Sequence, residues 1–181
     1  MYEVELKLRA DHDALQARLN KAGAERVDSR RQVDTYYDAP HRSFADTDEA
    51  LRIRREKPAD GERVTKLTYK GPLVDAASKT REEHETAVDD DEAVQGVLAG
   101  LGFEPAATVE KDRTYYDFEG YTLVLDTVDG LGEFVEIERE VPESEIDTAR
   151  EEAIELLERL GLSPDDQLRT SYLGLLLAID E

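Results

Sequence analysis

Two short segments near opposite ends of the chain alternate glutamate with apolar residues, Glu3-Val4-Glu5 and Glu136-Ile137-Glu138. Alternate side chains of a β-strand point to the same face, so each segment would present two carboxylates together. If the two strands meet, these carboxylates could ligate a hard divalent cation whose coordination is completed by substrate phosphates. Ordinary surface ion pairing is the alternative, because a chain with 44 acidic residues contains many such pairs by chance.

Basic residues recur with the same alternating spacing in the segments between these two. Arginine contacts phosphate oxygens in a bidentate manner and lysine acts as a point charge, so bases converging from several strands would bind a polyphosphate. The basic residues of these faces are Lys7, Arg52, Arg54, Lys66, Lys70, Arg81, Lys111 and Arg113. A third alternating pair, Glu83 and Glu85, is expected to hold bases such as Arg52 in position through ion pairs.

The segments that carry these residues have the pattern of β-strands separated by glycine-containing turns. Six strands are predicted over Glu3–Arg9, Ala50–Arg55, Val64–Lys70, Arg81–Ala87, Tyr121–Asp126 and Phe134–Glu140, and two long strands end at Asp38 and Asp117. Amphipathic helices are predicted at about Asp11–Ala22, Asp90–Leu101 and Ser144–Leu160. A final helix, around Leu168–Ile179, is apolar on several sides and is expected to pack on the outside of the sheet.

The chain also contains an internal repeat. A shift of 79 residues aligns Thr35-Tyr36-Tyr37-Asp38 with Thr114-Tyr115-Tyr116-Asp117, and Gly23 with Gly102. Similarity between two helices would not account for the repeated Thr-Tyr-Tyr-Asp. We therefore expect an ancestral duplication of a strand–helix–strand unit.

These patterns predict an α+β fold in one domain spanning residues 1–181. Consecutive strands joined by short turns favour antiparallel pairing, and amphipathic helices can cover the apolar face of the sheet. The charged face would then turn inward in an eight-stranded antiparallel β-barrel with the helices packed outside, which leaves no exposed strand edge. An open sheet with its charged face in solvent is the alternative.

Composition excludes several classes of function. The net charge of −21 opposes nucleic acid or an anionic membrane as a partner, because phosphate binding needs a positive field. The absence of cysteine excludes disulfides, thiolate metal sites and cysteine nucleophiles. No apolar run is long enough to span a bilayer and no secretory leader is visible, so a cytoplasmic location is expected. The acidic excess is typical of a surface adapted to high salt.

The ordered set of motifs resembles the CYTH, or triphosphate tunnel metalloenzyme, superfamily. Glu3-x-Glu5-x-Lys7 is similar to its N-terminal signature, and Asp34-Thr-Tyr-Tyr-Asp38 followed by Ala50-Leu-Arg-Ile-Arg54 resembles the class IV adenylyl cyclase branch. Further similarities are Thr68-Tyr-Lys-Gly-Pro72, Arg81-Glu-Glu83, Lys111-x-Arg113, Glu136-x-Glu138 and Ser171-Tyr-Leu173. The likeness covers essentially the whole chain.

The resemblance implies a barrel that binds a triphosphate in its lumen with Mg²⁺ or Mn²⁺. The family's metal-binding acids would match Glu3, Glu5, Glu136 and Glu138, with Asp126 as a further candidate. Its phosphate-binding bases would match Lys7, Arg52, Arg54, Lys70, Arg81, Lys111 and Arg113, and the spacing adds Lys66. Glu5, Lys7, Lys70 and Glu136 are the candidates for catalysis.

Three functions remain open at this point. The resemblance favours a cyclase that converts ATP to 3′,5′-cyclic AMP and pyrophosphate, while other members of the family hydrolyse thiamine triphosphate or inorganic triphosphate. A polyphosphate- or nucleotide-binding module without turnover is the alternative from another class. A monomer or a homodimer is expected for each of these functions.

Overall fold

The computed structural model describes residues 1–179 and contains, within that range, eight β-strands. Every predicted strand is present, and most extend one or two residues beyond the predicted ends. The strands are β1 (Tyr2–Arg9), β2 (Glu25–Asp38), β3 (Ala50–Pro58), β4 (Val64–Lys70), β5 (Arg81–Val88), β6 (Glu104–Phe118), β7 (Tyr121–Val128) and β8 (Gly132–Val141).

Five α-helices connect or follow the strands in the described part of the chain: α1 (His12–Ala22), α2 (Phe44–Thr47), α3 (Asp91–Gly100), α4 (Ile146–Arg159) and α5 (Tyr172–Ile179). The Asp11 side chain caps α1 by accepting a hydrogen bond from the Ala14 N–H, and α1 ends at Gly23, whose φ of +82° is the left-handed conformation that glycine favours. Among residues 1–179, no helix is long and apolar enough to cross a bilayer.

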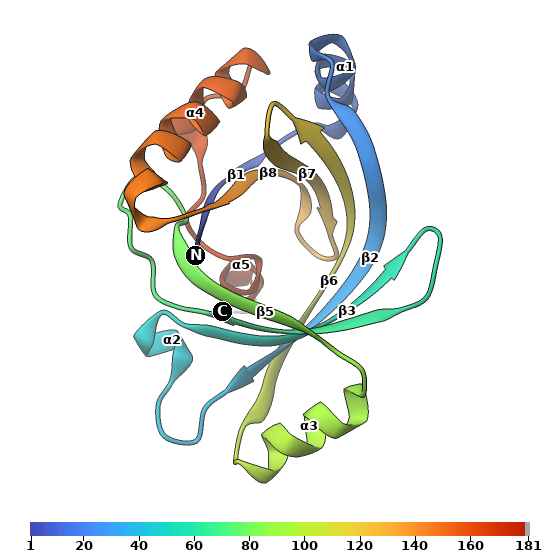
Figure 1. Cartoon of the computed structure of the whole chain (residues 1–181), viewed down its shortest axis with the longest axis vertical. Helices are drawn as coiled ribbons and strands as arrows, with labels where there is room; N and C mark the ends of the chain where they lie inside the picture. The colour runs from blue at the N-terminus through green and yellow to red at the C-terminus, as the bar shows by residue number, and fades with distance from the viewer. Residues whose placement is uncertain (180–181) are drawn as a thin grey trace.

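The strands form a closed antiparallel barrel in the order β1-β5-β4-β3-β2-β6-β7-β8, visible as a ring in Figure 1. Strand β1 pairs with β8 along its whole length, from Tyr2 opposite Val141 to Arg9 opposite Phe134. Its pairing with β5 involves only Tyr2 and Glu3. The prediction of a barrel is therefore confirmed, and the first and last strands meet as the carboxylate spacing required.

The strand pairing has the twofold pattern expected of a duplication. Exchanging β1 with β5, β2 with β6, β3 with β7 and β4 with β8 returns the same cyclic order, read in the opposite direction. The central pair of the β2–β6 ladder is Gln32 opposite Lys111, two residues separated by the 79 positions of the repeat. A pseudo-twofold axis therefore passes through this pair and relates the two halves of the barrel.

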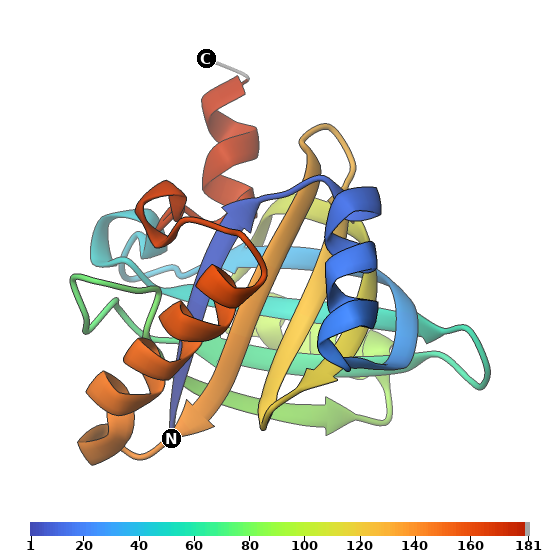
Figure 2. The ribbon, with the colours of Figure 1, turned by 90° about the horizontal axis from the view of Figure 1, so that it is seen from above.

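Apolar side chains on the outer face of the barrel bind three of the helices. Helices α1 and α4 pack over β1 and β6–β8, where Leu19 and Leu157 contact a cluster that includes Leu6 and Ile137. Helix α3 covers the opposite side, with Leu98 against Ile53. Figure 2 shows α1 and α4 lying across the strands. Because the helices cover the apolar face, the charged face lines the lumen.

Helix α5 departs from the expectation that it packs on the outside. It lies at one mouth of the barrel, within the ring of strands in Figure 1 and rising from one end in Figure 2. Tyr172 is buried beside Val109, Val128 and Phe134, all of which point inward. The apolar character on several sides of this helix reflects its insertion between strands from different parts of the barrel.

The net charge of −21 leads to a prediction about stability. Screening of repulsion among surface carboxylates should raise the melting temperature by several degrees between dilute buffer and molar KCl. Differential scanning fluorimetry across a salt series measures this shift, with a non-ionic osmolyte at matched osmolality as the control. Equal melting temperatures at low and molar salt would refute an adaptation to high salt.

Candidate active site

A cavity of about 830 Å³ occupies the lumen and is lined by residues of all eight strands. This volume lies within the range of about 300–1,000 Å³ that is typical of small-molecule sites. Most of the residues proposed from the sequence line it: Glu3, Glu5, Arg52, Arg54, Lys66, Lys70, Arg81, Lys111, Arg113, Glu136 and Glu138. Lys7 and Asp126 lie behind this lining.

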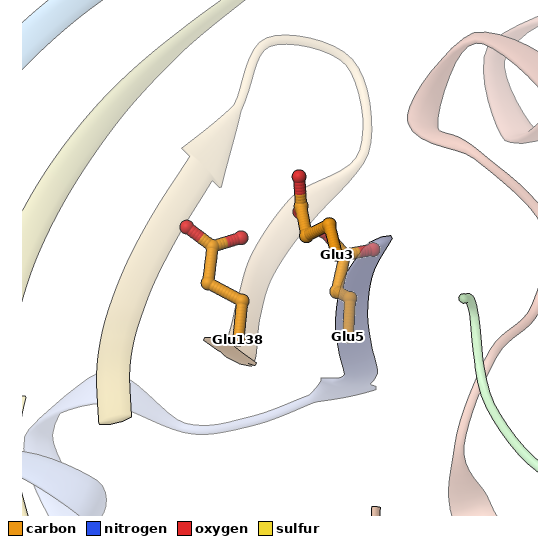
Figure 3. A group of neighbouring side chains, drawn as sticks. All are labelled: Glu3, Glu5 and Glu138. Atoms are coloured by element: carbon orange, nitrogen blue, oxygen red, sulfur yellow. The ribbon is translucent and has the colours of Figure 1, made fainter. Parts of the chain in front are cut away.

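Three carboxylates form an acidic cluster on one side of the cavity. Glu3 and Glu5 project from β1 and Glu138 from β8, with ligand oxygens that all lie within 4.8 Å of one another (Figure 3). The β1–β8 ladder creates this arrangement, because Glu5 is directly opposite Glu138. The cluster therefore depends on closure of the barrel between the first and last strands.

The acidic cluster has the properties of a divalent-cation site. Burial and the neighbouring Glu3 carboxylate raise the pKa of Glu138 well above its usual range. Like charges held this close are unfavourable unless a cation neutralises them, and carboxylate oxygens are the ligands that Mg²⁺ and Mn²⁺ prefer. The residues present thus fit such a cation.

Glu136 lies further along β8 and has a different environment. Its carboxylate accepts a hydrogen bond of 3.1 Å from the Arg113 guanidinium. Burial, together with the nearby Glu5, raises the pKa of Glu136. Glu136 thus lies between the acidic cluster and the buried bases.

A basic wall of Arg52, Lys66 and Lys70 lines the cavity along β3 and β4. Arg52 and Lys70 make only long ion pairs with inward-facing carboxylates, at 3.6 Å from Arg52 to Glu85 and 3.7 Å from Lys70 to Glu3, whereas Lys66 pairs closely with Glu56 at 2.9 Å. The Nε atom of Arg52 is buried and has no hydrogen-bond partner among the described residues. An unpaired buried donor is costly, so the basic wall retains capacity for an anionic ligand.

The other predicted bases are already paired inside the wall of the barrel. Arg54 binds Asp34 through two hydrogen bonds of 2.7 and 2.8 Å, and Arg113 binds Asp126 through two of 2.7 Å. Lys111 donates a further bond of 3.1 Å to Asp34. The pseudo-twofold axis relates the two arginine–aspartate pairs with their charges exchanged. These pairs connect neighbouring strands and fix the bases in position.

Asp126 and Lys7 are placed differently from the other predicted site residues. Asp126 accepts a hydrogen bond of 2.8 Å from Tyr172 besides those from Arg113, and it lies outside the acidic cluster. Lys7 is fully buried, donates to the Thr170 carbonyl and has its ammonium 4.3 Å from the centre of the Tyr172 ring. Burial, with repulsion from Lys79, lowers the pKa of Lys7 to about 7. Both residues connect the barrel to the segment that leads into α5.

Arg81 holds the rim of the cavity together. Its guanidinium donates to the carbonyls of Asp48 and Gly71, each at 2.8 Å, and to the Asp48 carboxylate at 3.0 Å. These bonds join the loop after α2 to the loop after β4. Arg81 therefore lines the cavity with most of its donors directed to the protein.

The duplicated half of the barrel has no equivalent of the acidic cluster in residues 1–179. The pseudo-twofold axis places Glu85 where Glu5 stands in the first half, but β4 brings Thr68 opposite Glu85 whereas β8 brings Glu138 opposite Glu5. Thr68 donates a hydrogen bond of 2.8 Å to Glu85, and Arg52 lies 3.6 Å away, as the sequence led us to expect. Although burial opposes the effect, these contacts lower the pKa of Glu85.

The cavity lining includes residues outside the set proposed from the sequence, among them Lys79 and Tyr172. Lys79 lies in the loop between β4 and β5, and its ammonium is 2.8 Å from the Glu5 carboxylate. Its position two residues before Arg81 continues the alternation of β5, and this spacing was a usable signal. Tyr172 belongs to the Ser171-Tyr-Leu173 segment of the family resemblance, but no local pattern indicates that α5 enters the mouth of the barrel and brings this side chain to the lumen.

Comparisons with known proteins agree with this architecture. The family described as CYTH domain matches residues 1–172. A Methanocaldococcus jannaschii protein, provisionally named an adenylate cyclase, is 39% identical over 177 residues that cover 97% of this chain and 98% of that protein. The adenylate cyclase CyaB of Aeromonas hydrophila is 29% identical over 174 residues, covering 94% and 86% of the two chains. A Pyrococcus horikoshii protein of known structure superposes with a TM-score of 0.91 at 40% identity, covering 98% of this chain and 99% of that one.

Proposed function

Because this chain belongs to the CYTH domain family, whose members bind triphosphates, we propose that it is a cation-dependent enzyme that converts ATP to 3′,5′-cyclic AMP and pyrophosphate. The observation that carries the proposal is that clustered carboxylates and several bases line one cavity. Three clustered carboxylates lie next to the basic wall, with Lys70 3.7 Å from Glu3, in a lumen that can hold a small molecule. Binding of a polyphosphate alone would need the bases and not the carboxylates.

Different residues of the cavity would bind the triphosphate and the divalent cation. Arg52, Lys66 and Lys70 would hold the phosphate oxygens, and Arg52 would use its unpaired Nε. Glu3, Glu5 and Glu138 would hold a divalent cation, which supplies Lewis-acid polarisation of a phosphoryl oxygen when bound. In ATP, attack of the ribose 3′ oxygen on the α-phosphorus forms one P–O bond. The bond between the α-phosphorus and the oxygen that bridges to the β-phosphate breaks, and the 3′ hydroxyl releases its proton.

Hydrolysis of a triphosphate is the second candidate function. The end of the cavity near α2 and α5 is lined by apolar groups, including Phe44, Leu51 and Leu177. An apolar surface accepts a thiazolium or another organic group as readily as adenine, while the charged groups recognise only the triphosphate. Thiamine triphosphate and tripolyphosphate are therefore the competing substrates.

Product analysis distinguishes these functions. The protein is incubated with ATP, thiamine triphosphate or tripolyphosphate at high salt with Mg²⁺ or Mn²⁺, and every product is quantified by chromatography and ³¹P NMR. We expect cyclic AMP and pyrophosphate in equal amounts from ATP, with no product when the cation is chelated. Release of orthophosphate instead would assign hydrolysis. Binding without any product would assign a non-catalytic module.

A further inference from the structure

The loop between β4 and β5 brings the ammonium group of Lys79 into direct contact with the acidic cluster. The Lys79 ammonium lies 2.8 Å from Oε2 of Glu5, and the lysine side chain is mostly buried at 11% exposure. Burial opposes protonation, but the Glu5 and Glu136 carboxylates raise the pKa of Lys79 above its ordinary value. In the absence of a divalent cation, Lys79 is therefore the direct counter-ion of Glu5.

The backbone around Lys79 is held by hydrogen bonds, while its ammonium is at the end of a flexible side chain. The Lys79 N–H donates to the Glu5 carbonyl at 2.9 Å, and Arg169 donates to the Ser78 carbonyl at 3.3 Å. The first bond attaches the loop to β1, where β5 leaves that strand largely unpaired, and the second attaches it to the segment before α5. The ammonium lines the cavity at the end of a flexible four-carbon stem, and its close ion pair is with Glu5. It can change partner without rearrangement of the loop.

Lys79 differs in this respect from Lys70 of the basic wall. Lys70 lies at the longer distances of 3.7 Å from Glu3 and 3.6 Å from Glu83, so it makes no close ion pair. Its charge is available to an anion whether or not a cation is bound. Lys79 instead occupies a carboxylate oxygen that a divalent cation would need.

We propose that Lys79 is a positioning residue that exchanges partners: it binds Glu5 until a divalent cation takes that carboxylate, and it then binds the triphosphate. The inference rests on the proposed function, because it assumes that both ligands enter this cavity. The exchange makes cation and triphosphate binding cooperative, and the coupling is reciprocal. A bound divalent cation releases Lys79 from Glu5 to bind the triphosphate, and a bound triphosphate withdraws Lys79 from the carboxylate that the cation needs.

The first test measures the binding of Mn²⁺ alone by calorimetry. Lys79→Met removes the competitor of the cation and is expected to tighten Mn²⁺ binding about tenfold, equivalent to roughly 1.4 kcal/mol. Lys79→Arg retains the ion pair and should bind Mn²⁺ like the wild type. Lys70→Met is the matched control, since it removes a charge near Glu3 without freeing Glu5, and it should tighten binding by no more than about threefold. Lys79→Gln replaces Lys79→Met if the latter does not fold.

The second test measures the affinity of the protein for tripolyphosphate with and without Mn²⁺. In the presence of a chelator, Lys79→Met should bind tripolyphosphate like the wild type, because Lys79 is then engaged by Glu5, whereas Lys70→Met should bind it several-fold more weakly. With the Mn²⁺ complex of tripolyphosphate, both variants should bind more weakly than the wild type.

Two results would overturn the exchange. Mn²⁺ binding that is unchanged or weaker in Lys79→Met would show that Lys79 does not compete with the cation. An equal loss of cation-free tripolyphosphate binding in Lys79→Met and Lys70→Met would show that Lys79 is already available to anions. If the wild-type protein bound neither Mn²⁺ nor tripolyphosphate, the proposed function itself would fail.

Discussion

Glu138→Gln is expected to lower cation-dependent turnover more than about 100-fold, since loss of groups that merely support metal ligands already costs about 10–100-fold. The change removes one of the three clustered carboxylates and leaves the side-chain volume nearly unchanged. The fold should not suffer, because the neutral amide resembles the protonated carboxyl that the raised pKa of Glu138 favours. The melting temperature of the variant should equal or exceed that of the wild type. Steady-state rates and Mn²⁺ titration measure the first effect, and calorimetric unfolding measures the second.

Glu85→Gln is the matched control for this prediction. It makes the same chemical change on the same inner surface, but Glu85 lies beside Thr68 and Arg52 in the half of the barrel that lacks the acidic cluster. Its Mn²⁺ affinity should stay within about threefold of the wild type, because a ligand charge is not lost. Equal losses of Mn²⁺ affinity in Glu85→Gln and Glu138→Gln would mean that the cation binds elsewhere in the cavity.

Arg113→Ala is expected to destabilise the protein strongly before it affects any ligand. The substitution leaves Asp126 buried without its bidentate partner, and breaking a buried ion pair in this way costs about 3–5 kcal/mol. For a chain of this length, that loss lowers the melting temperature by about 6–20 °C. Thermal and denaturant unfolding of the purified variant measure the effect.

Two further variants isolate the cause. Lys70→Ala removes a base that makes only long ion pairs, so it should leave the melting temperature within about 2 °C and weaken tripolyphosphate binding. The double change Arg113→Met with Asp126→Leu removes both charges and should recover most of the stability lost in Arg113→Ala. A stable Arg113→Ala protein with weakened tripolyphosphate binding would show that Arg113 serves the ligand and not the barrel.

The contrast between Arg113 and Lys70 shows that residue type and spacing alone do not establish the role of a base. Both are basic, alternate correctly along a strand and line the same cavity. Their roles differ because β7 places Asp126 opposite Arg113, whereas β4 and β5 place Lys70 opposite Glu83 with a looser fit. Strand pairing brings together residues that are distant in the chain, and this pairing sets the charge that each base must neutralise.

Local pattern was sufficient for the secondary structure and for the inward face. Alternation in Glu3–Arg9 or Val64–Lys70 is a property of consecutive residues, since a strand's geometry alone directs every second side chain to one side. The repeated Thr-Tyr-Tyr-Asp segment likewise indicated the duplication that the β2–β6 ladder displays. The family likeness rests on the same ordered residues. The sequence by itself therefore indicated the barrel, its charged lumen and most of the charged residues of the cavity.

Only the tertiary structure decided how those residues are grouped. Glu138 joins Glu3 and Glu5 because the barrel closes between β1 and β8, while Asp126 is neutralised by Arg113 one strand away. Helix α5 enters the mouth of the barrel because inward-facing apolar groups such as Phe134 bind it there, and a helix that is apolar on several sides does not reveal which surface it will contact. The counter-ion of Glu5 is Lys79, supplied by a loop through contacts across the fold. Interactions between segments that are distant in the chain form only when the barrel closes, so local sequence patterns do not indicate them.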